Sequence, residues 1–252
     1  QVLAIKGVLS PPPASAEDGD LSAALVRAAE RGKQVTAVCD VQEGQSAWTL
    51  QLEDAGVHVA QGLSGLRNHG KVLLVVRREG GGVRRYVHLS TGDHDPGAAR
   101  LRTDLSLFTC REELGADVSA LFNLLTGHSA PPSWQRLSVA PLGLKERVLA
   151  LIDAEARSAQ AGRPARIVAK MNALSDPELI RALYRAALSG VDIDLIVRGV
   201  CCLRPGVPGL SERVRVIAHC DRLLEHSRVF CFHAEGRREV YLSSVDWLSH
   251  PL

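Results

Sequence analysis

Two short motifs in this chain place a histidine two residues before a basic side chain. His69 precedes Lys71 in the run GLRNHGK, and His226 precedes Arg228 in the run LLEHSR. Side chains two residues apart along a strand point to the same face, so each imidazole is expected beside a fixed cation. Such a pair suits phosphoryl chemistry, because the cation binds phosphate oxygens while the histidine attacks phosphorus or protonates a leaving group.

The two motifs belong to a longer internal repeat. A single motif of this kind is weak evidence, because a histidine at the start of a strand is usually a polar residue of the sheet edge. The two histidines are 157 residues apart, and Ala23–Gly32 shares six identities in ten with Arg181–Gly190 at an offset of 158. A third correspondence joins the run YVHLSTGD to the run VYLSSVD. Three landmarks in nearly one register indicate a duplication.

The duplication suggests how one site is made from two halves. A pseudo-two-fold axis would bring His69 and His226 face to face, one as the nucleophile and the other as the acid or electrostatic partner. The third landmark ends in an aspartate in each half, Asp93 and Asp246. Each carboxylate is placed to orient an imidazole and fix its tautomer, or alternatively to cap a turn.

Each half also has the same expected order of elements: a helix, two strands, a strand at the His-x-basic motif, and a strand ending in Ser or Thr and Asp. Residues 21–41 and 177–200 both read as an amphipathic helix, a glycine stop and a buried strand. A further helix is expected from Leu144 to about Gln160, followed by a strand in GRPARIVAKMNALSD. Short apolar strands alternating with helices predict an α/β fold with mixed sheets flanked by helices.

The join between the halves is expected in the turn-rich stretch His128–Gln135, which contains two prolines. The predicted domains are therefore residues 1–130, with His69, and residues 131–252, with His226.

Composition limits the class of protein. Among 252 residues, 30 are basic and 28 acidic, for a formal net charge of +2, and 46% are hydrophobic. These values exclude a disordered chain and a strongly basic nucleic-acid tail. The six cysteines show no disulfide framework spacing, and neither a CxxC nor an HExxH metal signature occurs. With no signal peptide and no apolar run near the ~18 residues of a membrane span, a cytoplasmic protein without a membrane span or a metal held by its own side chains is expected.

Longer segments around the motifs resemble a known family. They resemble polyphosphate kinase of the bacterial type 1 over nearly all of residues 2–247, in GVHVAQGLSGLRNHGKVLLVVRREGGGVRRYVHLSTG, GADVSALFNLLTG, RPARIVAKMNALSDPELI, DLIVRGVCCLRPGVPGLSE, LLEHSRVF and EVYLSSVDW. The paired His-x-basic halves also look like the phospholipase D superfamily. The resemblance implies two tandem phospholipase D-like α/β domains related by a pseudo-two-fold duplication.

The resemblance further implies reversible transfer of the terminal phosphate of ATP to inorganic polyphosphate through a phosphohistidine. By motif match, His69 would be phosphorylated, His226 would be the second catalytic histidine, and Arg198 in LIVRG would bind nucleotide phosphate. Lys71 and Arg228 would neutralise oxygens of the moving phosphoryl group.

The same resemblance implies the remaining ligands. Arg100 and Arg102 lie in the matching segment AARLRTDL, where Arg100 either assists phosphate binding or is a surface residue. Arg102 stands in place of a family tyrosine, so a nucleotide contact has changed character. The expected partners are ATP or ADP and polyphosphate, with Mg²⁺ arriving with ATP, no nucleic acid, and room for a homo-oligomer.

Several segments depart from the family pattern. Arginines of the family are expected where this chain has Val8–Pro13 and Cys39–Ser46, and the family's TGNYN-like turn is Thr91–Asp95 here. The chain corresponds to the C-terminal half of the family, either as an excised piece or as a diverged gene product.

Three interpretations therefore stay open: a polyphosphate kinase catalytic region, a non-catalytic remnant that binds polyphosphate or a protein partner, and a phospholipase D-like phosphodiesterase or nuclease. The third is disfavoured because the second half carries His-x-Arg and because a net charge of +2 offers little attraction to nucleic acid.

Overall fold

A computed structural model of the chain shows two compact units, Gln1–Leu101 with Ser106–Leu137, and Arg102–Leu105 with Ser138–Leu252. The short segment 102–105 thus groups with the second unit although it lies within the first half of the sequence. Most of the departures expected at 8–13 and 39–46, and part of the predicted join, fall outside the described residues. The structure describes residues 1–10, 20–39, 47–63, 65–66, 68–94, 96–127, 129 and 133–249.

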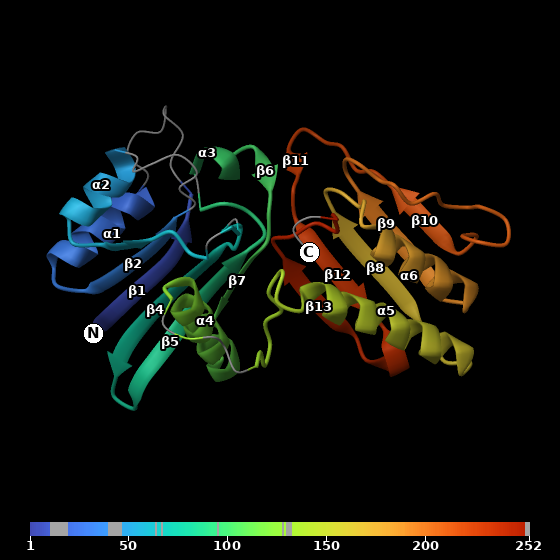
Figure 1. Cartoon of the computed structure of the whole chain (residues 1–252), viewed down its shortest axis with the longest axis horizontal. Helices are drawn as coiled ribbons and strands as arrows, with labels where there is room; N and C mark the ends of the chain where they lie inside the picture. Colours follow the sequence, from blue (N-terminus) through green and yellow to red (C-terminus); the bar gives the residue numbers. More distant parts are fainter. Residues whose placement is uncertain are drawn as a thin grey trace. The chain divides into compact units, whose positions relative to one another are not determined.

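The first unit is built on a mixed six-stranded sheet with the order β3-β2-β1-β4-β5-β7 (Figure 1). β1, β2 and β3 run parallel, whereas β4 is antiparallel to β1, β5 to β4, and β7 to β5. The strands are β1 (Val2–Leu9), β2 (Gln34–Cys39), β3 (His58–Ala60), β4 (Val72–Glu79), β5 (Gly82–Ser90) and β7 (Ser106–Thr109).

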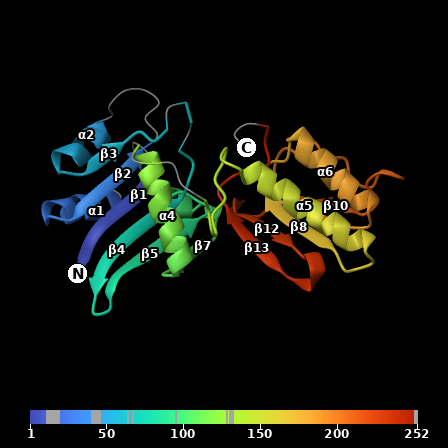
Figure 2. The same ribbon diagram turned by 60° about the horizontal axis from the view of Figure 1, so that its bottom comes forward.

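Helices cover both faces of this sheet. The helices α1 (Asp20–Glu30) and α2 (Ala47–Asp54) pack on one face around Leu25 and Leu52, and α4 (Glu112–Leu125) packs on the other around Phe122 (Figure 2). Strand β2, next to the edge strand β3, lies between these two layers and contributes buried residues to both. This burial on two faces explains why β1 and β2 read as nearly continuous apolar runs in the sequence.

The second unit repeats the same topology. Its five-stranded sheet has the order β10-β9-β8-β12-β13, with the same parallel and antiparallel pairings as β3-β2-β1-β4-β5. The α/β fold with a duplicated mixed sheet is therefore confirmed. The elements are β6 (Arg102–Thr103), β8 (Arg166–Met171), β9 (Asp192–Val197), β10 (Val214–Ile217), β11 (Leu224–Glu225), β12 (Arg228–Phe232), β13 (Glu239–Ser243), α5 (Leu144–Gln160), α6 (Pro177–Leu188) and a 3₁₀ turn (Ala234–Gly236); in the first unit, α3 is Pro96–Ala99.

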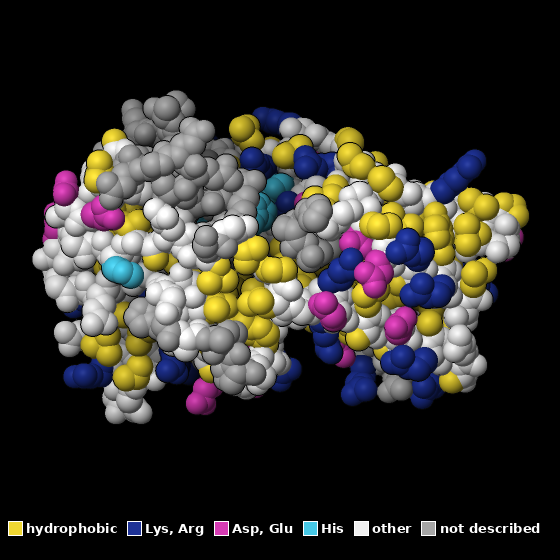
Figure 3. Space-filling model, viewed as in Figure 1, with side chains coloured by type: hydrophobic (Ala, Val, Ile, Leu, Met, Phe, Trp, Pro, Cys, Tyr) yellow, Lys and Arg dark blue, Asp and Glu magenta, His cyan; other side chains and the backbone are white. Residues whose placement is uncertain are grey.

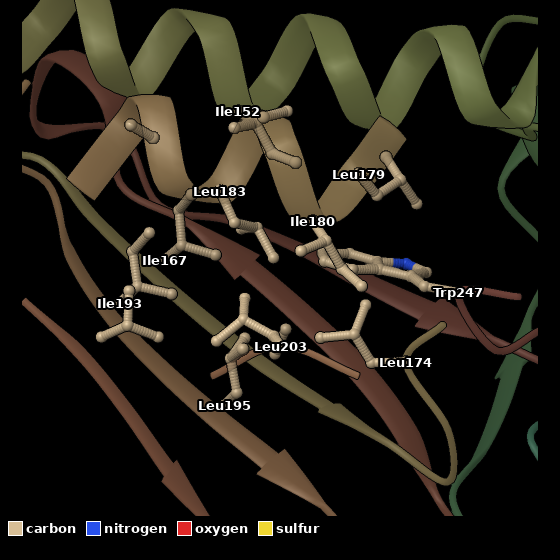
Figure 4. Packing of buried hydrophobic residues seen from close by; sticks show 14 of the residues in the cluster. Ile152, Ile167, Leu174, Leu179, Ile180, Leu183, Ile193, Leu195, Leu203 and Trp247 are labelled. Atoms are coloured by element: carbon tan, nitrogen blue, oxygen red, sulfur yellow. The ribbon is translucent and has the colours of Figure 1, made fainter. Parts of the chain in front are cut away.

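Both helices α5 and α6 cover one face of the second sheet, and the core lies beneath them. Figure 4 shows Ile152 and Leu183 from these helices above Ile167 and Ile193 from the sheet, with Trp247 closing one side of the cluster. The alternating pattern of β9, in which every second residue is buried, places the apolar side chains on this covered face.

The predicted helix boundaries agree with the structure. The helix expected from Leu144 to about Gln160 is α5. Helix α6 begins at Pro177, where the side chain of Asp176 accepts two backbone hydrogen bonds, and Gly190 follows it with a φ of 101°. A glycine adopts this left-handed conformation without a Cβ clash, which is why the helix stops there. None of the described helices is long and apolar enough to cross a membrane.

One expectation about the motifs is corrected. Each histidine lies before a strand, as expected, but the motifs do not alternate along the strands. His69 and Lys71 both precede β4, and His226 precedes β12, whose first residue is Arg228. The motifs therefore lie where the strands β4 and β12 begin. β-pairing starts at Val72 in the first unit and at Arg228 in the second, so both histidines stay at the sheet edge.

A buried carboxylate fastens the end of the first unit to α4. Asp117 is almost fully buried, and its oxygens accept the backbone N–H groups of Gln135, Arg136 and Leu137 at 2.7–3.1 Å. Three donors on one carboxylate satisfy its charge and hold the segment after α4 in place.

We therefore expect Asp117→Ala to lower the free energy of unfolding of the first unit by about 1–3 kcal/mol, because three backbone donors lose a buried acceptor. Urea unfolding followed by circular dichroism measures this change. The control Asp153→Ala removes an exposed carboxylate of α5 and should change stability by less than about 0.5 kcal/mol. Equal effects of the two substitutions would contradict the anchoring role of Asp117.

Candidate functional site

Four polar residues meet at one edge of the second sheet. Asn172 follows β8 and Arg198 follows β9, at the carboxyl ends of two parallel strands. Arg228 opens the antiparallel strand β12, and Asp246 follows β13, so both reach the same edge. Open α/β sheets bind ligands at the carboxyl ends of their parallel strands, so this edge is the candidate site of the second unit.

A bidentate ion pair fixes the centre of this edge. Nε of Arg228 donates to Oδ1 of Asp246 and Nη2 donates to Oδ2, each at 3.0 Å, and both side chains are largely buried. Oδ1 of Asp246 also accepts the backbone N–H of Asn172 at 2.7 Å. The fork geometry sets the plane of the guanidinium, and its Nη1 lies 3.4 Å from Nε2 of His226.

Arg198 is oriented through a second hydrogen bond at the same edge. Its Nε donates to Oδ1 of Asn172 at 3.1 Å, and the side chain is half-buried. This bond leaves the two Nη groups of the guanidinium as the ones that can bind an oxyanion. Asn172 thus connects Arg198 to the ion pair of Arg228, and sequence reasoning had not singled it out.

His226 is held by a carboxylate from a distant part of the chain. Its Nδ1 lies 2.9 Å from Oδ1 of Asp104, and its backbone N–H donates to the carbonyl of Thr103 at 3.2 Å. The two-residue strands β6 and β11 pair beside it. Because a carboxylate only accepts hydrogen bonds, Nδ1 is the donor in this contact, and Nε2 faces Nη1 of Arg228.

The residue that orients His226 is therefore Asp104, where Asp246 was expected. Asp246 contacts the guanidinium of Arg228, and the imidazole of His226 is turned toward the segment 102–105. Asp104 lies 122 residues from His226 in the sequence. No local pattern signals such a contact, which is why sequence reasoning missed it.

Lys170 supports the segment around His226 through two contacts. Nζ of Lys170, in β8, contacts the carboxylate of Glu225 at 2.9 Å and the hydroxyl of Ser227. The hydrogen bond from Lys170 holds the pKa of Glu225 below its usual range. These contacts tie both neighbours of His226 to β8.

The first unit has an equivalent edge. Lys71 is only 7% exposed, and its Nζ pairs with the carboxylate of Asp93, as Arg228 pairs with Asp246 in the second unit. The carbonyl of Lys71 accepts the N–H of Ser90 at 2.9 Å, which joins the start of β4 to the end of β5. The orienting role expected for Asp93 stays a prediction.

His69 lies half-buried in the loop before β4. The preceding Asn68 donates from Nδ2 to the carbonyl of Gln61 at 2.8 Å and packs against Gly62. Gly62 has a φ of 75°, and a Cβ there would lie within 2.3–2.8 Å of the Asn68 side chain. A glycine is therefore required for the loop that presents His69.

Two further histidines lie beside this edge and were not expected from the sequence. Nε2 of His94 lies 3.0 Å from Nδ1 of His88, and His88 stacks on Phe108 with ring centroids 4.3 Å apart. Burial, with added repulsion from His88 and Lys71, lowers the pKa of His94 to about 4. His94 is thus neutral at pH 7. Its only sequence signal is the departure from the family pattern in the turn 91–95.

The last two predicted residues lie in different units. Arg100 is exposed at the end of α3, in the first unit, whereas Arg102 is in β6, in the second. Within the described part of the chain, no group of three His, Cys, Asp or Glu residues is arranged to hold a metal ion.

We expect Asp104→Ala to change the tautomer of His226, because Nδ1 loses its acceptor. In ¹⁵N-resolved NMR of the imidazole, the wild type should show the Nδ1–H form and the variant a mixture of both forms. Asp221→Ala, which removes an exposed carboxylate nearby in the sequence, serves as the control. An unchanged His226 spectrum in Asp104→Ala would refute the assignment.

The pKa of His94 predicts a pH dependence of stability. Its usual value is about 6.5, so between about pH 6.5 and 4 the unfolded chain binds more protons than the folded one. As the pH is lowered through this window, the free energy of unfolding should therefore decrease, by up to about 3 kcal/mol relative to His94→Phe. Urea unfolding from pH 7.5 to 4.5 measures the difference, and parallel curves for the two proteins would contradict it.

Comparison with known proteins shows the family of the chain. Residues 1–131 match the family description "Polyphosphate kinase C-terminal domain 1", and residues 137–252 match "Polyphosphate kinase C-terminal domain 2". A polyphosphate kinase of Thermosynechococcus vestitus is 51% identical over 100% of this chain and 35% of its own length. One from Synechocystis is 52% identical over 93% of this chain and 33% of its own length.

A solved structure is similar as well. The crystal structure of polyphosphate kinase from Porphyromonas gingivalis aligns with a TM-score of 0.88 and 35% identity, over 100% of this chain and 39% of that one. The chain spans about a third of the length of the curated relatives it matches. These matches confirm the resemblance that the motifs indicated, and the chain belongs to the polyphosphate kinase family.

Proposed function

We propose that this chain is the catalytic region of a polyphosphate kinase, which transfers the terminal phosphate of ATP reversibly to inorganic polyphosphate. The observation that most supports this function is an ion pair that recurs in both units. A cationic side chain pairs with an aspartate, Lys71 with Asp93 and Arg228 with Asp246. Each pair lies at the same sheet edge of its unit, and its cation stands two residues after a histidine in the sequence. Such fixed cations beside an imidazole suit the binding and transfer of phosphate.

In the proposed mechanism, a ring nitrogen of His69 attacks the terminal phosphorus of ATP. A bond between nitrogen and phosphorus forms, the bond from phosphorus to the bridging oxygen breaks, and ADP leaves with that electron pair. A terminal oxygen of polyphosphate then attacks the phosphohistidine and regenerates the free imidazole. Lys71 binds the oxygens of the moving group, where most of the transition-state charge lies.

The second unit is proposed to hold the nucleotide and chain phosphates. Arg228 and Arg198 present guanidinium groups that the bonds to Asp246 and Asn172 hold in place. His226, with Asp104 on Nδ1, offers Nε2 as the position that takes up or donates a proton at a phosphate oxygen.

The two remaining arginines extend this proposal. Arg102 lies in β6, two residues before Asp104. β6 pairs with β11, the strand that leads into His226, and this position supports a contact with nucleotide phosphate. Arg100, exposed two residues earlier, is proposed to bind phosphate more weakly.

Magnesium is proposed to arrive as the complex with ATP. Three described carboxylates at the two sheet edges, Asp93, Asp104 and Asp246, are already bound to Lys71, His226 and Arg228. The triphosphate is therefore the better ligand for the ion. The exposed free thiols of the described chain, including Cys110, Cys202 and Cys220, favour a reducing compartment such as the cytoplasm.

Phosphoenzyme formation tests the proposed function. Incubation with γ-labelled ATP and Mg²⁺ should give label that is stable to alkali and labile to acid, as expected for phosphohistidine. His69→Ala should reduce this label to background, because the nucleophile is lost, whereas His58→Ala, an exposed histidine of β3, should retain it.

Other outcomes identify the alternatives. Binding of polyphosphate without any label would favour a non-catalytic remnant. Cleavage of a bis-aryl phosphate, abolished in His69→Ala, would favour a phosphodiesterase. Label that persists in His69→Ala would refute the assigned nucleophile.

A further inference from the structure

The hairpin formed by β4 and β5 concentrates positive charge away from the edge described above. Four arginines, Arg77, Arg78, Arg84 and Arg85, stand within nine residues of a chain whose formal net charge is only +2. In Figure 3, dark-blue basic side chains are visible at the lower end of the first unit, where this hairpin turns in Figure 1.

The register of the hairpin places two of these cations directly opposite each other. Arg77 faces Arg84 across the strands, an arrangement that destabilises a sheet unless the charge is compensated. The carboxylate of Glu79 lies 3.6 Å from Arg77 and 3.9 Å from Arg84, and it also accepts the hydroxyl of Tyr86 at 2.8 Å. One carboxylate thus serves two guanidinium groups through long contacts, so net positive charge remains.

The two cations are also exposed and held in place. Their side chains are 45% and 56% exposed, and the guanidinium carbon of Arg77 lies 5.6 Å from the centre of the Tyr86 ring. Continuous pairing from Val72 with Leu89 to Glu79 with Gly82 makes the hairpin a rigid support. Two partly exposed guanidinium groups at opposed positions of a paired hairpin are suited to bind a polyanion.

A line of polar side chains connects the hairpin with Lys71. Arg84, Tyr86, His88 and Ser90 alternate along β5 and therefore share one face. The N–H of Ser90 donates to the carbonyl of Lys71, so the line ends at the phosphate-binding edge of the first unit. The six residue steps from Lys71 to Arg77 span roughly 20 Å along a strand, which is much longer than tripolyphosphate.

We infer that Arg77 and Arg84 form a second binding site for inorganic polyphosphate, engaged by a long chain whose end lies at Lys71. This inference rests on the proposed function, which makes polyphosphate the substrate. Each guanidinium can grip phosphate oxygens of the chain, and the bound polyanion supplies the charge that the opposed arginines lack. Long chains therefore bind at two points, whereas tripolyphosphate binds at the sheet edge alone.

The test compares two double variants of the full chain. Arg77→Gln with Arg84→Gln removes two charges from the hairpin. Arg213→Gln with Arg215→Gln, called the β10 variant, is a matched control that removes two exposed arginines. Arg213 directly precedes β10 and Arg215 lies within it, and they are paired with Asp192 and Asp194 at 2.8 Å. Isothermal titration calorimetry measures binding of long-chain polyphosphate and of tripolyphosphate at two salt concentrations, and thermal unfolding checks each variant.

We expect the hairpin variant to bind long-chain polyphosphate roughly tenfold more weakly and with a smaller salt dependence, because two phosphate contacts are lost. Its affinity for tripolyphosphate and its unfolding temperature should match the wild type, and the β10 variant should match the wild type in all these measurements.

Several results would overturn the inference while leaving the proposed function intact. Unchanged affinity of the hairpin variant for long chains would do so, as would an equal loss in the β10 variant or a parallel loss for tripolyphosphate. Competition by single-stranded DNA at equal charge concentration would show a general polyanion surface instead. Failure of the wild type to bind either polyphosphate would instead refute the proposed function, and the inference with it.

Discussion

The ion pair between Arg228 and Asp246 connects the strands that build the second unit's site. Because Asp246 also accepts the N–H of Asn172, one carboxylate joins the ends of β8 and β13 to the start of β12. The pair is largely buried, so loss of either partner would leave an uncompensated charge at a cost of about 3–5 kcal/mol. The position of Arg198 follows from it, since Arg198 is bound to Asn172.

The first unit has an ion pair at the equivalent edge, between Lys71 and Asp93. The two ion pairs differ in the cation, and this difference has a physical consequence. A guanidinium bound through Nε and Nη2 has a fixed plane, with Nη1 directed at His226, whereas an ammonium is a compact charge with rotating donors. The second unit is therefore suited to hold a phosphate group in one orientation. The first is suited to follow a phosphoryl group as it moves.

The sequence alone was sufficient for much of this arrangement. Repeats with offsets of 157 and 158 residues predicted two halves of the same topology, and the capping residues around Pro177 and Gly190 predicted the ends of α6. Local patterns carry this information because helix ends and buried strands depend on nearby residues.

The partners within the site were not predictable in the same way. The contact of His226 with Asp104 depends on the pairing of β6 with β11. Each of these strands has only two residues, so neither leaves a periodic pattern in the sequence. The contact of Asp246 with Arg228, where one with His226 was expected, depends on how the side chains are arranged at the sheet edge. Both are decided by tertiary packing, which neither periodicity nor spacing encodes.

The assignment of residues 102–105 to the second unit has a consequence for how the two halves diverged. A duplicated gene normally yields two segments that can be exchanged, permuted or inherited separately. Here, a recombination event at the sequence midpoint would deliver a second half with His226 but without its carboxylate partner Asp104. The second unit therefore has its complete set of contacts only when the segment 102–105 is present, although each unit has its own sheet and its own core.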